Sequence, residues 1–283
     1  MPDRPTLALV GVTAIWGSTF VVVKDAIAKV PVLDFLTLRF ALAALVMIAV
    51  RPRALAALDR TAWRHGVLLG LVLAAGYATQ TFGLRTASAS VSGFVTGLFV
   101  VFTPLIAAVV LRRRVTRSVW LAVALATVGL GLISLHGLSI GRGELLTVFG
   151  AFFFALHIVG LGEWSHKYDA YALAIVQIAT VCVFSLVLAL VHDGSRGIAR
   201  PHQGSAWAAI GVTALLGTAA GFFLQTWSQA RMPATRAAVI LTMEPVFAGV
   251  TGVLSGETLA VRGWIGAACV LGAMYLVELT PGG

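Results

Sequence analysis

The chain has 283 residues, of which 59% are hydrophobic and only 11% are charged, and its mean hydropathy is +0.96. One soluble core cannot hide so much apolar surface, so this composition excludes an ordinary soluble protein and requires lipid as part of the solvent. The formal net charge is +9, but no connection between apolar stretches is long enough for a nucleic-acid-binding domain.

Apolar stretches of about twenty residues, the length that crosses a bilayer as a helix, recur along the whole chain. The first could be mistaken for a signal peptide, but it has no clear small-residue cleavage site, so we expect a retained helix. The sixth is the least regular, because Glu144, His157 and several glycines interrupt it. The sequence thus predicts an all-α, polytopic membrane protein with ten transmembrane helices, at residues 6–23, 33–50, 64–83, 90–111, 118–136, 144–162, 170–191, 206–229, 234–255 and 262–279.

The second half of the chain repeats polar, aromatic and proline positions of the first half in the same order. The matched residues, separated by 138 to 145 positions, are Trp16 with Phe154, Arg39 with Gln177, Gln80 with Gln225, and Pro104 with Pro245. We therefore predict two five-helix repeats, residues 1–138 and 139–283. Because five crossings are an odd number, the second repeat enters the membrane from the opposite side and is inverted.

The basic residues are distributed unevenly between the two sides that this topology defines. Twelve Lys and Arg residues fall in connections on one side, with dense runs at 51–64 and 112–117, and seven fall on the other side. The positive-inside rule then places the first side in the cytoplasm, together with both termini. We expect a multi-pass protein of a bacterial-type inner membrane.

The sequence contains no recognisable pattern of the residue types that carry enzymatic chemistry. Cys182 and Cys269 each lie within a predicted span and are expected to pack there as small apolar residues. The six histidines show no metal-ligand spacing, and no hydrolase, nucleotide-binding or dinucleotide-binding motif is present. The sequence predicts no catalytic residues, no metal site and no cofactor.

Glu244 is the most unusual polar residue, because it lies near the middle of the ninth predicted span. An ionised carboxylate at the bilayer centre costs roughly 2.5–3.5 kcal/mol on insertion scales unless a partner or water lies beside it. Glu244 is therefore a candidate for coupling proton movement to a solute, although it could instead fasten the helix by bonding neighbouring donors. Its counterpart in the first half is the uncharged Thr103, also a candidate for lining a cavity.

Pro104 and Pro245 occupy matching places in the fourth and ninth predicted spans. Each removes a backbone donor and so leaves the carbonyl of Val100 or Leu241 without its helical partner, which favours a bend. Matched bends in two inverted halves would serve as hinges, and a static packing kink is the alternative interpretation.

Three further polar side chains lie within predicted spans. Arg39, in the outer part of the second span, could hold a substrate carboxylate, neutralise Glu244, or extend to the outer lipid headgroups. Gln80 and Gln225 form a pair that inversion places near opposite surfaces. They could act as matched gates or could simply join neighbouring helices.

Aromatic residues are spread through the spans rather than confined to their ends. Trp16, Tyr77, Phe99 and Phe154 are candidates for lining a cavity that accepts apolar or ring-bearing solutes. His157 in the sixth span could be a relay or ligand group, and a packed neutral histidine is the alternative.

Several stretches are similar to the EamA-type exporters of the drug/metabolite transporter superfamily. They are WGSTFVVVKDAI in the first span, FLTLRFALAAL in the second, the proline-bearing fourth span, and MEPVFAGVTGVLSGETLAVRGWIGAACVLGAMYLV at the end. The resemblance covers nearly the whole chain. Its most specific parts are the Trp-Gly-Ser motif at Trp16 and a Glu-Pro, Gly-Glu, Gly pattern made by Glu244, Pro245, Gly256, Glu257, Gly266 and Gly272.

The resemblance implies ten helices in two inverted repeats and a central cavity lined mainly by helices one to four and six to nine. It also implies outward movement of amino acids or related metabolites. The first half departs from the pattern, because Thr103 and the basic run at 112–114 stand where the second half has Glu244 and a Gly-Glu turn. This difference argues against two equivalent ion sites.

Together these features predict a secondary transporter, not an enzyme, that exports small metabolites by alternating access around a central cavity. Aromatic or other neutral amino acids are the leading substrates, and the expected partners are the solute, the lipid bilayer and, as a candidate coupling ion, the proton. A facilitator, a uniporter or a multidrug exporter of the same fold is the alternative. A membrane scaffold or sensor without transport belongs to a different class. The sequence says nothing of the oligomeric state.

Overall fold

The computed structural model describes residues 3–112, 114–134, 141–193, 197–256 and 260–278. Every regular element within these ranges is helical, which confirms the all-α prediction for this part of the chain. The predicted boundary at 138 and 139 lies outside the described residues, as does Glu257. The elements are α1 (Arg4–Ile27), α2 (Val32–Val50), η1 (Ala54–Ala57), α3 (Arg60–Leu84), α4 (Ala89–Thr96), α5 (Phe99–Val110), α6 (Arg117–Ser134), α7 (Arg142–Trp164), η2 (Ser165–Lys167), α8 (Ala170–Asp193), α9 (Gly204–Val212), η4 (Thr213–Ala220), α10 (Gly221–Gln229), α11 (Ala234–Leu241), α12 (Met243–Leu254) and α13 (Val261–Glu278).

Eight helical runs are long and apolar enough to cross a membrane, and they coincide with eight of the ten predicted spans. The irregular sixth span is among them, as α7. The other two predicted spans fall on α6 and α13, whose described apolar parts, Arg117–Gly129 and Val261–Ala273, are shorter. Large apolar side chains such as Val109 and Leu254 are exposed on the outside, as expected where lipid is the solvent.

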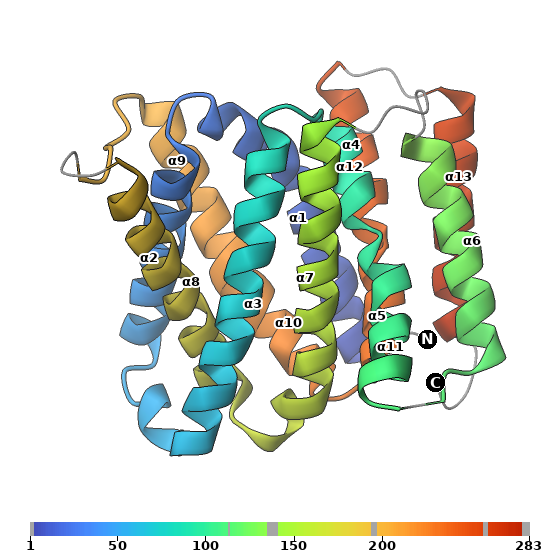
Figure 1. The fold of residues 1–283 in the computed structure, drawn as a ribbon, viewed down its shortest axis with the longest axis horizontal. Helices are drawn as coiled ribbons and strands as arrows, with labels where there is room; N and C mark the ends of the chain where they lie inside the picture. The colour runs from blue at the N-terminus through green and yellow to red at the C-terminus, as the bar shows by residue number, and fades with distance from the viewer. Residues whose placement is uncertain (1–2, 113, 135–140, 194–196, 257–259, 279–283) are drawn as a thin grey trace.

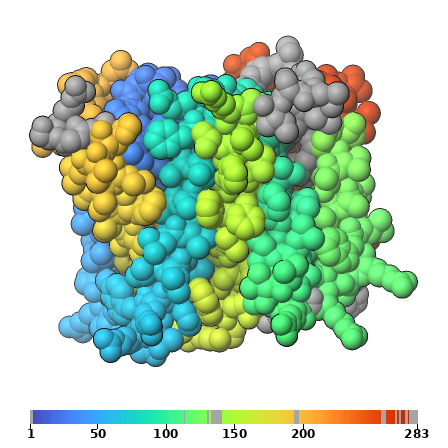
Figure 2. Space-filling model, in the orientation of Figure 1, coloured from blue at the N-terminus to red at the C-terminus, as the bar shows by residue number. Residues whose placement is uncertain are grey.

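Helices from the two halves of the chain pack against each other. Helix α1 contacts α10 and α12, α3 contacts α7 and α8, and α2 contacts α8. Helices α3 and α7 lie side by side across the middle of one face (Figure 2). Helices α6 and α13 pack on each other at one edge of the molecule, and the start of α1, η1 and the α5–α6 connection share one end of the bundle (Figure 1).

Both proline-bearing spans are interrupted. The first is divided into α4 and α5 at Gly97 and Leu98, and the second into α11 and α12 at Thr242. At each break a backbone N–H, that of Leu98 or of Thr242, donates to the carbonyl three residues earlier at 3.1 Å, which tightens the turn. Each break lies before its proline rather than at it. Pro245 falls in the first turn of α12, where no N–H is needed, whereas Pro104 lies inside α5.

The eighth span contains a π-helical segment, η4, between α9 and α10. The wider turn shifts hydrogen bonds by one residue, so that Thr218 Oγ1 donates to the carbonyl of Thr213, five residues earlier, at 2.9 Å. Such segments are rare and frequently occur at functional sites. The segment lies directly beside the cavity described below.

Asp169 holds the start of α8 and ties it to the end of α2. Its Oδ1 accepts from the N–H of Ala172 at 2.9 Å, and its Oδ2 accepts from Arg51 Nη1 at 2.8 Å. Partial burial of the carboxyl opposes its ionisation, but the hydrogen bonds from Ala172 and Arg51 outweigh that effect. The pKa of Asp169 is therefore below its usual value.

We expect Asp169→Ala to destabilise the protein by about 1 kcal/mol at neutral pH, the usual cost of a lost helix cap. Asp169→Asn should cost less, because asparagine still caps and the half-exposed ion pair contributes only about 0.2–1 kcal/mol. Since the pKa of Asp169 is lower in the folded state, its charge stabilises fully above the unfolded value of about 3.9, and the effect is lost as pH falls through the folded value. Thermal unfolding in detergent at several pH values measures this. A loss in Asp169→Asn that persists in acid would contradict the charge contribution.

A candidate substrate cavity between the two halves

A cavity lies at the centre of the helices, and α1, α2, α3, α4, α5, α7, α10, α11 and α12 all contribute side chains to it. Of the residues that the sequence nominated, those that line it are Trp16, Arg39, Tyr77, Gln80, Phe99, Phe154, His157, Gln225 and Glu244. Thr103 does not line the cavity. It is completely buried, and its hydroxyl has no hydrogen-bond partner among the described residues. Pro104 and Pro245 also lie outside the lining.

The cavity is narrow. The space open to the centre of a water-sized sphere is about 60 Å³. One water molecule needs about 10–15 Å³ of such space. It therefore has room for several water molecules in this conformation, and a ring-bearing solute requires its walls to move apart.

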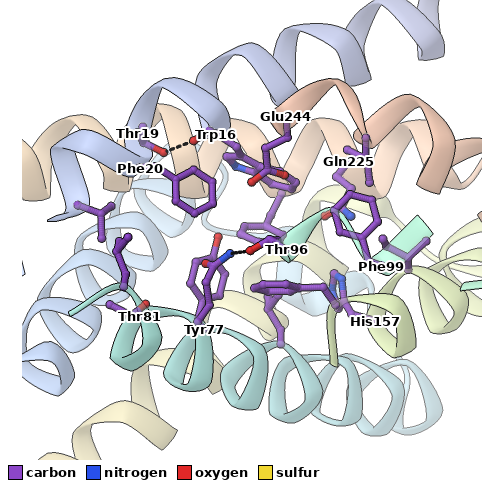
Figure 3. A pocket seen from close by; sticks show the side chains of 18 of the residues that line it. Trp16, Thr19, Phe20, Tyr77, Thr81, Thr96, Phe99, His157, Gln225 and Glu244 are labelled. Atoms are coloured by element: carbon purple, nitrogen blue, oxygen red, sulfur yellow. Dashed lines mark hydrogen bonds between the residues drawn. The ribbon is translucent and has the colours of Figure 1, made fainter. Parts of the chain in front are cut away.

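Glu244 lies in the first turn of α12, directly after the break at Thr242, and points into the cavity (Figure 3). Its side chain is buried, with 6% of its surface exposed. No described residue forms a hydrogen bond or ion pair with its carboxylate. The break partly offsets the cost of burying this carboxylate, because the start of a helix carries positive partial charge that favours an anion.

Gly17 allows α1 to pass directly over this turn. A Cβ atom at Gly17 would lie 2.5 Å from the carbonyl oxygen of Glu244 and 2.8 Å from the backbone nitrogen of Ala248. The sequence motif Trp-Gly-Ser thus has a structural meaning that the sequence alone did not reveal. The glycine brings the two backbones together so that the neighbouring Trp16 enters the cavity.

Trp16 is held in the cavity by the π-helical segment. Its indole Nε1 donates to the carbonyl of Gly217 at 2.6 Å, and its ring packs against Phe222 with the centroids 5.3 Å apart. A Cβ atom at Gly221 would lie 2.8 Å from the same indole nitrogen, so a glycine is needed there as well. The orientation of Trp16 is therefore set by η4 and α10.

Arg39 is buried in the protein, with 3% of its surface exposed, and does not extend to the headgroups. Its Nε donates to Thr218 Oγ1 at 2.7 Å, and its Nη2 donates weakly to the hydroxyl of Tyr77 at 3.5 Å. The guanidinium carbon lies 5.1 Å from the centre of the Tyr77 ring and 5.5 Å from that of Phe40, within the range of cation–π attraction. It forms no ion pair with Glu244, although both described side chains face the same cavity.

An aromatic cluster forms much of the remaining wall. The ring of Tyr77 meets those of Phe154 and Phe222 edge to face, with centroids 5.5 and 5.9 Å apart. His157 packs against Phe222 and its Nε2 shares a hydrogen bond of 2.6 Å with Gln177 Oε1. The sequence did not single out Phe222, because apolar residues fill every position around it.

The two glutamines line the same cavity from α3 and α10. Gln80 Nε2 donates to Thr96 Oγ1 at 2.8 Å (Figure 3). Gln225 Nε2 donates to Gln229 Oε1 at 3.1 Å, and the Oε1 of Gln225 is buried without a partner among the described residues. Gln225, a residue of the cavity lining, therefore has an unused acceptor atom that is covered in this conformation.

Comparison with known proteins agrees with this architecture. The sequence profile of the EamA-like transporter family matches residues 4–135 and again residues 141–279. A protein described as an uncharacterized transporter, from Archaeoglobus fulgidus, is 31% identical over 274 residues, which are 96% of this chain and 85% of that protein. A solved crystal structure at 20% identity superposes with a TM-score of 0.77 over 98% of both chains, a likeness that shows the fold alone. The chain is a multi-pass membrane protein that belongs to the EamA-like transporter family.

Proposed function

We propose that this protein is a secondary transporter that exports small metabolites, with aromatic and other neutral amino acids as the leading substrates. The observation that carries the proposal is the central cavity, in which a buried carboxylate, Glu244, has no partner among the described residues and faces aromatic side chains from both halves of the chain. A buried ionisable group in a membrane protein is costly and is typical of solute and proton pathways. The protein acts by alternating access around this cavity.

The proposed architecture is ten transmembrane helices in two inverted repeats, residues 1–138 and 139–283. Two observations support it. The family profile matches the chain twice, once in each half. The contacts between the halves also follow the same pattern in both directions. Helix α1, the first of the first half, packs on α10 and α12, which belong to the third and fourth spans of the second half. Helix α7, the first of the second half, packs on α3 and α5, which belong to the third and fourth spans of the first half.

The interruptions in the fourth and ninth spans are the proposed hinges. Each occurs on the N-terminal side of a proline, at the start of α5 and of α12, and the second carries Glu244 into the cavity wall. Because the cavity is too narrow for a ring-bearing solute, the walls must move apart during transport, and helix breaks require the least distortion. Gln80 and Gln225 are proposed to bond the solute or to close the cavity.

The proposed location is a bacterial-type inner membrane, with both termini in the cytoplasm. Arg51, Arg53 and Arg60 lie around η1, at the same end of the bundle as the start of α1 (Figure 1). Basic residues concentrate in cytoplasmic connections, which supports this orientation.

Reconstitution into liposomes tests the proposal. We expect counterflow of at least one labelled neutral amino acid, and accumulation of it when a pH gradient is imposed. Counterflow without pH-driven accumulation would identify a facilitator. No flux of any member of a broad panel of amino acids and amphiphiles would contradict transport and favour a scaffold or sensor.

A further inference from the structure

We propose that Arg39 binds a carboxylate of the transported solute, and that Thr218, in the π-helical segment η4, positions its guanidinium for that contact. The proposal rests on the transport function proposed above and assigns the anionic group of the solute to one residue. It concerns a side chain for which the sequence left three partners open, namely a substrate carboxylate, Glu244 and the outer lipid headgroups, and which the structure places in the cavity lining.

Arg39 is a buried cation for which the described part of the chain supplies no anion. Its side chain forms no ion pair with any described carboxylate, and its contacts are a threonine hydroxyl, a tyrosine hydroxyl and two aromatic rings. A buried charge without a counter-ion is strongly unfavourable, so it persists where a ligand or a mechanism requires it. Pairing with an anionic solute would remove this penalty.

One edge of the Arg39 guanidinium is held by hydrogen bonds, and the other edge has no hydrogen-bond partner among the described residues. Thr218 fixes Nε and Tyr77 contacts Nη2, while no described residue accepts a hydrogen bond from Nη1. Arginine binds carboxylates through two parallel N–H groups in a planar fork, which a lysine cannot do. Because Arg39 lines the cavity, its free N–H groups are available to a carboxylate that enters.

The π-helical segment explains how the positioning contact is made. Thr218 Oγ1 donates its proton to the carbonyl of Thr213, five residues earlier, and so keeps its lone pairs for Arg39 Nε. In an ordinary helix a threonine hydroxyl bonds three or four residues back, so this partner depends on the wider turn. Gly217 leaves the required space, because a Cβ atom there would lie 3.3 Å from Arg39 Nη2.

Acceptor groups on residues of the same cavity lining support a solute that also carries N–H groups. Gln225 Oε1 is buried without a partner among the described residues, and Glu244 presents a carboxylate. The residues of the cavity lining thus include donors at Arg39, acceptors at Gln225 and Glu244, and several aromatic rings. An amphoteric, ring-bearing solute matches this distribution, whereas a simple hydrophobic cation leaves Arg39 without an anion.

Matched ligands test the assignment. Binding of phenylalanine, phenylalaninamide, phenethylamine and 3-phenylpropionate to purified protein is measured by competition, for the wild type and for Arg39→Gln, Arg39→Lys, Thr218→Val and Thr218→Ser. We expect Arg39→Gln to weaken the binding of phenylalanine and 3-phenylpropionate by about 10- to 100-fold, which corresponds to the loss of a charge-assisted hydrogen bond. Binding of the two ligands without a carboxylate should be unchanged or improved.

The positioning role of Thr218 predicts a smaller loss with the same ligand selectivity. Thr218→Val removes the hydroxyl and should weaken only carboxylate ligands, whereas Thr218→Ser retains the hydroxyl and should restore their binding. Arg39→Lys keeps the charge but loses the fork, and should fall between wild type and Arg39→Gln. Each variant is compared by gel filtration and ligand-free thermal unfolding, so that misfolded protein is recognised.

If Arg39→Gln lowered the affinity for all four ligands equally, Arg39 would have a purely structural role and the proposal would be overturned. If phenylalanine is not bound, the same comparison is made between a transported carboxylate from the counterflow panel and its amide. A panel in which only solutes without an anionic group are transported also overturns it, while the transport function stands. Absence of all flux would instead contradict the transport function itself.

Discussion

Replacing Glu244 with glutamine is expected to abolish pH-driven accumulation of the solute while counterflow continues. The carboxylate is buried in the cavity wall and has no partner among the described residues, so it is the group in the cavity best placed to exchange a proton. Glutamine has nearly the same shape and can still hydrogen-bond, but it carries no proton that can be released. Proteoliposomes with and without a pH gradient measure the two activities separately.

Glu144→Gln is the matched control, because it makes the same chemical change in the first turn of α7 and outside the cavity. It should leave both activities unchanged. If Glu244→Gln still accumulates solute against a gradient at the wild-type rate, Glu244 has no coupling role. If it loses counterflow as well, Glu244 binds the solute rather than the proton alone.

Gly17→Ala is expected to cause the largest loss of stability and transport among single-methyl changes in α1. The new Cβ atom would meet the backbone at Glu244 and Ala248, and backbone atoms cannot move aside as a flexible side chain can. Overpacking of this kind costs about 1–3 kcal/mol. It would also push α1 away from α12 and so displace both Trp16 and Glu244 from the cavity.

Gly11→Ala provides the control for this prediction, because Gly11 lies on the same helix and a Cβ atom there meets nothing within 4 Å. Its unfolding temperature should be unchanged or higher, since alanine favours the helix over glycine by up to about 1 kcal/mol. Thermal unfolding and counterflow are measured for both variants. Similar behaviour of the two would show that the close approach of α1 to α12 is not required.

The sequence was sufficient to predict most helices, because a run of apolar residues long enough to cross a bilayer is a local property. It also identified nine of the nineteen residues that line the cavity, since polar and aromatic residues within apolar spans are few. It could not predict the π-helical segment, which contains no proline and is hydrogen-bonded to Trp16 and Arg39 in other helices. For the same reason it left the surroundings of Arg39 open.

The unequal pair Thr103 and Glu244 shows a second limit. Repeat matching aligned the two residues and so nominated both for the cavity. In the structure only Glu244 lines it, whereas Thr103 is buried elsewhere in the first half. The breaks are also offset differently from their prolines, because Leu98 lies six residues before Pro104 and Thr242 lies three residues before Pro245. Sequence correspondence between halves therefore does not guarantee that matched side chains face the same space.

The pairing of α6 with α13 has a consequence for how the protein is made. Helix α6 ends the first half of the chain, but the helix with which it makes its most extensive contacts is the last described element. During synthesis α6 therefore remains in the bilayer without its main neighbour until translation is almost complete. Its own hydrophobicity and its contacts with α4 and α5 have to hold it there. A truncated chain that stops before α13 should be an early target for membrane quality-control proteases.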